Sequence, residues 1–227
     1  EIENISLIID SLFNIKIGLD ILVVDDNSPD GTSDVVKNLM NKYKGKLFLE
    51  KRDKKDGLGV AYVHGFNWAL YRKYDYIFQM DADFSHNPNE LEKMINHLDL
   101  DVDVIIGSRY KNGVNVINWP LSRILLSYIA SIYVRFITSM PIKDPTSGFV
   151  GYKKEVLEVI NINRIKFVGY AFQIEMKFKA WINGFNLKEK SIVFLNRGRG
   201  NSKMDSSIIL EAFFGVLFLR ACKKKTK

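Results

Sequence analysis

The sequence predicts one α/β domain with a mostly parallel central sheet that is flanked by helices. Between residues 20 and 110, apolar strand-like runs alternate with helix-like runs, which is the order of an open sheet with right-handed crossovers. Three of these strands end in charged residues. The chain has 227 residues, 47% of them hydrophobic and 26% charged, so it is long and apolar enough for one packed soluble domain.

The elements of the first half follow one another at short intervals. The run at residues 20–26 has the composition of a strand that is buried on both faces, and turn residues follow it. The elements predicted after this turn are a helix to about Tyr43, a strand at 46–51, a helix from Gly57 to about Lys73, a strand at 74–80, a helix from Pro88 to about Leu98 and a strand at 102–106.

The second half is predicted to contain longer helices. Its elements are an amphipathic helix at 119–140, a strand at 149–152, a helix at 172–181, a strand at 185–194 and a terminal helix. Residues 2–12, at the other end of the chain, are also helix-like. We divide the chain into the α/β domain at residues 1–205 and an amphipathic helix with a basic tail at residues 206–227.

Polar residues follow three of the predicted strands. Ligands of open α/β sheets bind beyond the carboxyl ends of the strands, because these ends meet at one edge of the sheet. We therefore expect the polar side chains to gather there. In chain order they are Asp25 and Asp26, then Asp81 and Asp83, and then Arg109.

The pair Asp81 and Asp83 is the sharpest local signal. Two carboxylates one residue apart at a strand end supply the hard oxygen ligands that Mg²⁺ or Mn²⁺ prefers, together with phosphate oxygens. Ser85 adds a weak oxygen ligand to this set or caps the next helix. Two acids that cap the helix after Pro88 are the alternative interpretation. Asp25 accepts hydrogen bonds from a nucleotide or belongs to a solvated turn.

Basic residues form the second set. Guanidinium groups match phosphate oxygens in bidentate geometry, so the set indicates phosphate binding. A solvated surface position stays open for each residue taken alone. The residues, all at element ends or in loops, are Arg109, Arg123, Arg197, Arg199 and Lys203.

The remaining polar residues receive structural interpretations. The three histidines, His64, His86 and His97, share no metal-ligand spacing and are taken as structural or solvent-facing. Gln173 and Glu175 either reach the site or form an ordinary pair on a helix surface, and the surface pair is the favoured interpretation.

Cysteine usage and the ends of the chain point to a compartment. The single cysteine, Cys222, excludes a disulfide framework and a cysteine-based zinc site. Together with the lack of a signal peptide before Glu1, it favours a reducing compartment.

The C-terminal segment combines apolar and basic residues. The formal net charge is +7, and lysines and one arginine between 220 and 227 carry five of the positive charges. The stretch 208–219 before them is apolar except for Glu211 and is shorter than the roughly 20 residues that span a bilayer. A helix lying on anionic lipid explains both features, rather than nucleic-acid binding. A core-packed helix with a basic end is the alternative.

Seven segments resemble a known family from one end of the chain nearly to the other. They are Val23-Val-Asp-Asp-Asn-Ser-Pro-Asp-Gly-Thr32, Gly57-Leu-Gly-Val-Ala-Tyr62, Met80-Asp-Ala-Asp-Phe-Ser-His86, Gly107-Ser-Arg-Tyr110, Asp144-Pro-Thr-Ser-Gly-Phe149, Gly169-Tyr-Ala-Phe-Gln-Ile-Glu175 and Arg197-Gly-Arg-Gly-Asn-Ser-Lys203. With these segments the chain resembles the dolichol-phosphate mannose synthase group of the inverting, family 2 glycosyltransferases, which have a GT-A fold.

The resemblance implies a role for each matching residue. The nucleotide-sugar site that it implies consists of Glu1, Val23, Asp25, Asp81, Ala82, Asp83, Ser85, Arg109, Arg197 and Lys203. Within this set, Asp81, Asp83 and Ser85 form a metal site, and Asp83, Arg109 and Arg197 are the catalytic residues. A lipid-phosphate site is implied at Arg123 and Ser127. One departure stands out. Similar proteins start with a strand that ends in a glutamate, and this chain starts at Glu1, so we expect the natural chain to extend upstream.

The activity implied is transfer of mannose from GDP-mannose to a polyprenyl (dolichyl) monophosphate, with inversion and with Mg²⁺ or Mn²⁺. The implied setting is the cytoplasmic face of a membrane, reached through surface helices or small membrane subunits, with no nucleic-acid partner. The same chemistry with UDP-glucose and a non-catalytic membrane-surface domain are the alternatives. A sugar nucleotidyltransferase is disfavoured, because the turn 27–31 is acidic rather than glycine-rich.

Overall fold

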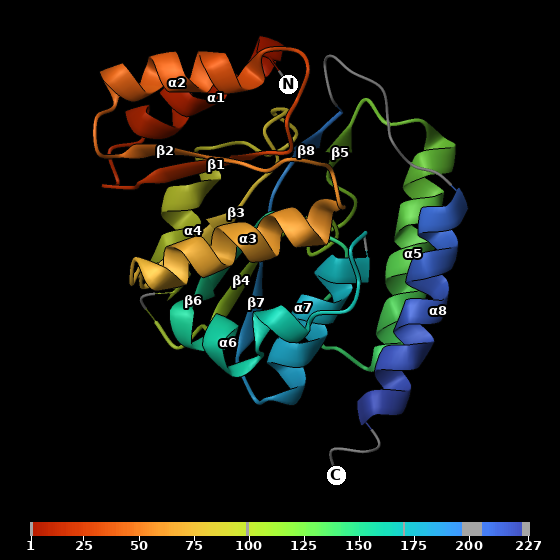
Figure 1. The fold of residues 1–227 in the computed structure, drawn as a ribbon. Helices are drawn as coiled ribbons and strands as arrows, with labels where there is room; N and C mark the ends of the chain where they lie inside the picture. Colours follow the sequence, from red (N-terminus) through yellow and green to blue (C-terminus); the bar gives the residue numbers. More distant parts are fainter. Residues whose placement is uncertain (1, 99, 170, 197–205, 224–227) are drawn as a thin grey trace.

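The structure is a computed structural model and describes residues 2–98, 100–169, 171–196 and 206–223. Its helices and strands alternate as the sequence predicts (Figure 1). The helices are α1 (Ile2–Asn14), α2 (Thr32–Lys42), α3 (Leu58–Tyr71), α4 (Glu90–Leu98), α5 (Leu121–Thr138), α6 (Lys154–Val159), η1 (Ile162–Arg164), α7 (Ala171–Ile182) and α8 (Ser206–Lys223). The strands are β1 (Ile21–Asp25), β2 (Leu47–Lys51), β3 (Tyr76–Gln79), β4 (Val104–Ser108), β5 (Val116–Ile117), β6 (Val150–Lys153), β7 (Leu187–Ser191) and β8 (Phe194–Leu195).

The central sheet has four strands in the order β3-β6-β4-β7. Strand β4 pairs with β7 in parallel, whereas β6 runs antiparallel to both β3 and β4. The strands β3, β4 and β7 therefore share one direction, as predicted, and β6 is the exception. A separate parallel pair, β1 and β2, lies beside this sheet under α1 and α2 (Figure 1).

The predicted strand at 185–194 is divided into two. Strand β7 ends at Ser191, and the chain then leaves the central sheet to form β8, which pairs with β5 in parallel. The two-residue strand β5, which the sequence did not predict, exists only through this pairing. The division matters because it moves residues 194 to 196 from the sheet to the edge where the strands end.

Two apolar clusters hold the fold together. In the first, α3, α6 and α7 cover the central sheet, with Phe66 in edge contact with Tyr152 at 5.7 Å between ring centroids. In the second, α2 packs on β1 and β2 with α1 beside it, and α4 packs on β4 and β6 of the central sheet, around side chains such as Ile9 and Met94. Helix α7 is buried along residues 171–178, because its apolar residues lie on every side of the helix.

Helices α5 and α8 form a pair on one side of the molecule, at the right of Figure 1. Tyr133 of α5 stacks on Phe213 of α8 at 4.9 Å, and the Tyr133 hydroxyl donates to the Phe213 carbonyl. Much of this pair is exposed; among its apolar side chains, Phe136 is 82% exposed and Phe214 is 63% exposed. Within the described residues, α5 alone is long and apolar enough to cross a membrane by length and composition, with mean hydropathy 1.3 and 17% of it buried.

Candidate active site

The acid pair follows strand β3. Asp81 Oδ1 accepts a hydrogen bond from the Tyr62 hydroxyl at 3.2 Å, and the Asp81 backbone N–H donates to His86 Nδ1 at 3.3 Å. Asp83 Oδ1 accepts from the backbone N–H of Ser85 at 3.0 Å and from its hydroxyl at 2.5 Å. Tyr62 of α3 thus holds the Asp81 carboxylate, and bonds within the turn hold that of Asp83, both at the strand end where the sequence places them.

Two neutral groups border the acid pair. Burial raises the pKa of Tyr62 well above its ordinary value, and the charge of Asp81 raises it further, so the phenol stays a neutral donor. Burial lowers the pKa of His86, so its ring is neutral at physiological pH. Because Nδ1 of that ring accepts from Asp81, its proton lies on Nε2. His86 is buried, which agrees with its structural interpretation.

The acid pair fits a divalent cation of the Mg²⁺ or Mn²⁺ type. Within the described residues, no group of three or more His, Cys, Asp or Glu side chains is placed to hold a metal ion. A hard cation of this kind binds through one or two carboxylates and completes its shell with substrate phosphates and water. Asp81 and Asp83 match that pattern, with the half-buried Ala82 between them.

Arg109 lies directly after strand β4 and is held by a buried acid. Asp144 accepts from the Arg109 backbone N–H at 2.9 Å, from Nε at 2.8 Å and from Nη2 at 2.6 Å. Burial opposes the charge of each partner, yet their mutual attraction lowers the pKa of Asp144 and raises that of Arg109. Both residues therefore stay charged in the interior. Glu189 fixes the Asp144 backbone N–H in turn, at 2.8 Å.

Aromatic rings connect Arg109 to the start of helix α5. The Arg109 guanidinium lies over the rings of Tyr110 at 5.1 Å and Trp119 at 5.8 Å, and Arg123 lies over Trp119 at 4.0 Å. The Tyr110 hydroxyl donates to Ser127 Oγ at 2.8 Å. The structure thus brings together Arg109, Arg123 and Ser127. The start of a helix favours an anion, and Arg123 adds a positive charge there, so this end of α5 suits phosphate binding.

Strand β8 and the turn 144–148 connect the acid pair to the arginines. The Ser85 carbonyl accepts from the Leu195 N–H at 3.2 Å, and the next residue, Asn196, accepts from Arg123 Nη1 at 3.1 Å. On the other side, a Cβ built on Gly148 would lie 3.7 Å from Asp81 Oδ2, so the turn 144–148 borders the acid pair. Strand β8 and this turn place both sets at the same edge of the sheet, as the sequence analysis expects.

The remaining predicted residues are placed as follows. Asp25 ends β1 and is buried; its carboxylate accepts from the Ser28 N–H and from the Ser33 hydroxyl, so it closes a turn. Val23 faces Leu49 in the β1–β2 pair. Glu1, Arg197 and Lys203 lie outside the described residues, and their assignments stay predictions.

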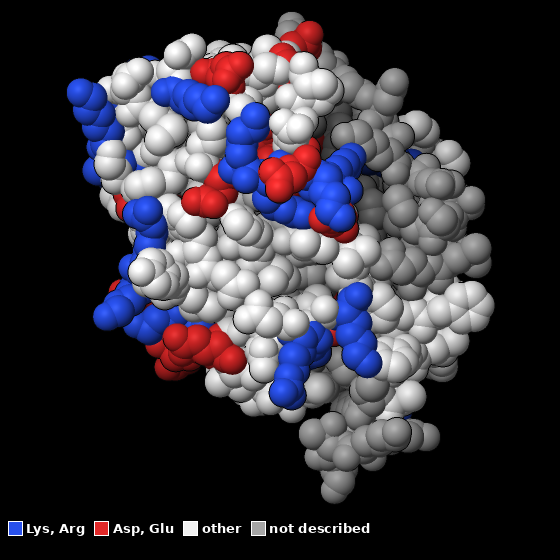
Figure 2. Space-filling model, viewed as in Figure 1, with Lys and Arg blue, Asp and Glu red and all other residues white. Residues whose placement is uncertain are grey.

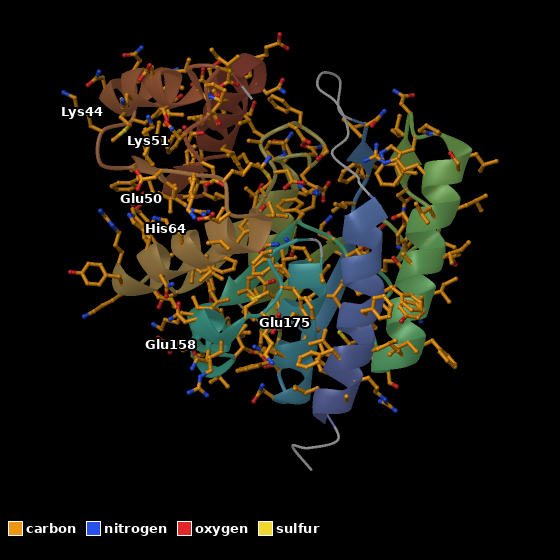
Figure 3. All side chains as sticks on the ribbon, turned by 45° about the vertical axis from the view of Figure 1, so that its right-hand side comes forward. Lys44, Glu50, Lys51, His64, Glu158 and Glu175 are labelled. Atoms are coloured by element: carbon orange, nitrogen blue, oxygen red, sulfur yellow. The ribbon has the colours of Figure 1, made fainter. Side chains whose placement is uncertain are left out.

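One interpretation from the sequence was wrong. Gln173 and Glu175 are buried rather than a surface pair, because α7 is enclosed between the sheet and α8. Glu175, labelled on α7 in Figure 3, accepts from the backbone N–H groups of Lys166 and Phe167 and pairs with Lys179 at 3.0 Å. Apolar residues on every side of this helix were the signal that indicated its burial.

Among the residues that the structure describes, His64 and the charged surface over β1, β2 and α3 add no second site. His64 of α3 and Glu50 of β2, both labelled in Figure 3, lie 3.1 Å apart as a partly exposed pair. Figure 2 shows that acidic and basic side chains are interspersed on the face over β1, β2 and α3. Two of the ion pairs described are Arg52 with Asp26 and Lys54 with Asp56, each at 3.1 Å.

Sequence reasoning missed the residues that support the site. Tyr62 and Asp144 contact the predicted residues from other parts of the chain, 19 and 35 positions away, whereas Trp119 is close in sequence to Arg123, which lies over its ring. The Asp-Pro-Thr-Ser-Gly segment was quoted as a motif without a role for its aspartate. Burial of Asp144 and its position opposite Arg109 are tertiary features, so no local signal in the sequence indicated this pairing.

A family model and two curated proteins match this chain. The family model for glycosyl transferase family 2 matches residues 1–160. A polyprenol monophosphomannose synthase of Mycolicibacterium smegmatis is 42% identical over 216 residues, covering 95% of this chain and 82% of that protein. An undecaprenyl-phosphate mannosyltransferase of Micrococcus luteus is 38% identical over 216 residues, with 95% and 88% covered.

Solved structures share the fold. A glucosyl-3-phosphoglycerate synthase from Mycobacterium tuberculosis, in complex with Mn²⁺, uridine diphosphate and glucosyl-3-phosphoglycerate, has a TM-score of 0.67 at 16% identity, covering 97% of this chain and 76% of that one. A mannosyltransferase from Pyrobaculum calidifontis, in complex with GDP-Man and Mn²⁺, has a TM-score of 0.57 at 14% identity, with 100% and 71% covered.

Proposed function

Because this chain belongs to glycosyl transferase family 2, we propose that it transfers mannose from GDP-mannose to a polyprenyl monophosphate, with inversion at the anomeric carbon. The observation that carries the proposal is that strand β8 and the turn 144–148 hold the acid pair beside the arginines. The names of the two curated relatives support the acceptor and the sugar. The solved neighbours with Mn²⁺ and sugar nucleotides support dependence on a divalent cation.

On the donor side, Asp81 and Asp83 hold Mg²⁺ or Mn²⁺, with Ser85 as a further oxygen. The cation supplies a Lewis acid for the charge that develops on the departing diphosphate. Asp25 and Val23 contact the nucleotide, Ala82 lines its pocket, and Glu1, Arg197 and Lys203 complete this side. Tyr62 and Ser85 hold the carboxylates before the donor binds, so little reorganisation is needed at the moment of reaction.

On the acceptor side, Arg109, Arg123 and Ser127 receive phosphate. Asp144 occupies the Nε and Nη2 edge of Arg109, so Nη1 is the edge that faces a substrate anion. The acceptor is a phosphate monoester whose second pKa is about 6, so it is largely dianionic at neutral pH. Its oxygen attacks without a protein base. The buried histidine of this site, His86, agrees with this, because its ring is neutral and its Nδ1 already accepts a hydrogen bond from the Asp81 N–H.

In this proposal the enzyme binds the cytoplasmic face of a membrane through helices α5 and α8. Their exposed apolar side chains, which include Ile129 at 60% exposed, and the basic residues after them match an anionic lipid surface. Helix α5 lies along the surface in this proposal, because Ser127 and the buried Ser131 face the protein. Small membrane subunits are a second means of attachment. The acceptor headgroup then meets the site where α5 begins.

Product analysis tests the proposal. The protein is mixed with radiolabelled GDP-mannose, Mn²⁺ and a polyprenyl phosphate in vesicles, and the lipid fraction is analysed. We expect a mannosyl phosphate lipid in the β configuration, and no product when the cation is chelated. Parallel reactions with UDP-glucose test the other donor. Sedimentation with the vesicles but no transfer from either donor would overturn the enzyme assignment in favour of a membrane-binding domain.

A further inference from the structure

Helix α7 carries a lysine in the protein interior that the proposed reaction does not use. Lys177 has 0% of its surface exposed. Transfer of an ammonium group into an apolar environment costs a large desolvation free energy unless hydrogen bonds and opposite charges compensate it. A buried lysine at this position therefore requires specific partners.

The partners of Lys177 lie in the turn 144–148. Its Nζ donates to the Ser147 carbonyl at 2.7 Å and to the Gln173 carbonyl of its own helix at 3.1 Å. The Ser147 hydroxyl in turn donates to the Gly107 carbonyl at 2.6 Å. Ser147 therefore connects Lys177 to the strand end that carries Arg109.

A second contact reaches the same turn from Gln79 of β3, which also binds Gln173 of α7. Gln79 Nε2 donates to the Gly148 carbonyl at 3.0 Å and to Gln173 Oε1 at 2.5 Å. Two consecutive carbonyls of the turn are thus held, that of Ser147 by Lys177 of α7 and that of Gly148 by Gln79 of β3. The opposite end of the turn is Asp144, which binds Arg109 through three hydrogen bonds.

We propose that Lys177 is a positioning residue: its ammonium group holds the turn 144–148 in place and thereby aims the Arg109 guanidinium at the substrate phosphate. The part that concerns phosphate rests on the proposed function. The structural part, in which the state of Lys177 is transmitted through the turn to Arg109, does not depend on it.

The surroundings of Lys177 make this support depend on pH. Burial lowers the pKa of Lys177 to about 7, Arg109 lowers it as well, and Asp144 and Glu189 of β7 raise it. On the same helix, Glu175 and Lys179 pair with each other. The ammonium therefore loses its proton as the pH rises through about 7. A neutral amine donates a weaker hydrogen bond to Ser147 than a charged group does, so the turn is held less firmly at alkaline pH.

Kinetics of three variants test the proposal between pH 6 and 9. We expect K177M to lower kcat roughly tenfold to a hundredfold, because small misplacement of a binding group has effects of this size, with the KM for GDP-mannose little changed. The alkaline decrease of kcat disappears in K177M. K177R, whose guanidinium stays protonated, retains kcat at alkaline pH. The matched control K179M, on the same helix, keeps the wild-type profile.

An NMR measurement tests the structural part without any activity. The ¹⁵N signal of Arg109 Nε, assigned by its loss in R109K, is followed with pH in the wild type, K177M and K177R. We expect it to shift with a midpoint near pH 7 in the wild type and to stay constant in the two variants. A constant wild-type signal, or a K177M enzyme with wild-type kcat and pH profile, would overturn the proposal. A shift without mannosyl transfer would contradict the proposed function alone.

Discussion

The acid pair after β3 and Arg109 after β4 stand at the same edge of the sheet but are stabilised in opposite ways. The described hydrogen bonds to Asp81 and Asp83 come from uncharged donors, the Tyr62 hydroxyl and the Ser85 N–H and hydroxyl. Arg109 instead has a fully buried counter-ion, Asp144. Neutral donors orient carboxylates and leave their charge in place, whereas a counter-ion balances the charge of its partner.

The site therefore has two parts. The first is the acid pair, which leaves room for a ligand to balance its charge, and the second is Arg109 with Asp144, in which the protein itself supplies both charges. The two carboxylates and their described neutral donors suit a divalent cation, which enters with the donor in the proposed function. The Arg109–Asp144 pair is preorganised within the protein, so its effect on a phosphate depends on geometry more than on net charge. Changes to the first part are expected to affect binding of cation and donor, and changes to the second to affect folding as well.

The largest effect is expected for Asp83→Ala. In the proposed function, loss of this carboxylate removes a ligand of the cation that stabilises the leaving diphosphate. That stabilisation contributes several kcal/mol, so we expect turnover to fall by about three orders of magnitude or more. Calorimetry with Mn²⁺ and GDP checks the binding step. Asp101→Asn, an exposed acid elsewhere, is the matched control and keeps both properties. Undiminished Mn²⁺–GDP affinity in Asp83→Ala would contradict the assignment.

Asp144→Asn tests the other part of the site. The variant keeps the shape of the side chain but leaves the Arg109 guanidinium buried without its counter-ion, so the free energy of unfolding falls by about 3 kcal/mol. Denaturant unfolding measures this loss. The double variant with Arg109→Met is more stable than Asp144→Asn alone, because no uncompensated charge remains. Equal stability of wild type and Asp144→Asn would show that Asp144 does not hold the charge of Arg109.

The sequence predicts the first part of the site better than the second. Asp81 and Asp83 follow a predicted strand, and Arg109 follows another, so local pattern and the rule for open sheets are sufficient. The partner of Arg109 is 35 residues away, on a turn whose place depends on the antiparallel strand β6. No local pattern contains that information.

The same reason explains the misplaced boundaries. The strand predicted at 185–194 is broken at Ser191 because β8 pairs with β5, a contact between segments far apart in the chain. Burial of Gln173 and Lys177 also depends on what covers α7. Secondary structure and the polar strand ends are local properties of this sequence, whereas counter-ions and buried polar partners are tertiary ones.

A smaller effect is expected from the pH dependence of stability. The pKa of Lys177 is lowered from 10.5 to about 7 in the folded state, so the unfolded state binds more protons between these values and stability rises with pH there. Each pH unit contributes up to about 1.4 kcal/mol. Between pH 7.5 and 9.5 the wild type should therefore gain about 2 kcal/mol relative to K177M in urea unfolding. Parallel curves for the two proteins would show that Lys177 does not titrate in this window.

The smallest effect is expected where both parts of the site are left intact. Ser127→Ala removes the acceptor of the Tyr110 hydroxyl and one polar contact for the lipid phosphate, which together correspond to about 1 kcal/mol. The KM for the polyprenyl phosphate then rises roughly fivefold with kcat unchanged, as expected for loss of uniform binding. Ser131→Ala, one turn further along α5, removes only a bond to the Ser127 carbonyl and is the control. If Ser127→Ala lowered kcat and left KM unchanged, Ser127 would act in the transition state, and the acceptor phosphate would have to lie deeper, against Arg109 itself.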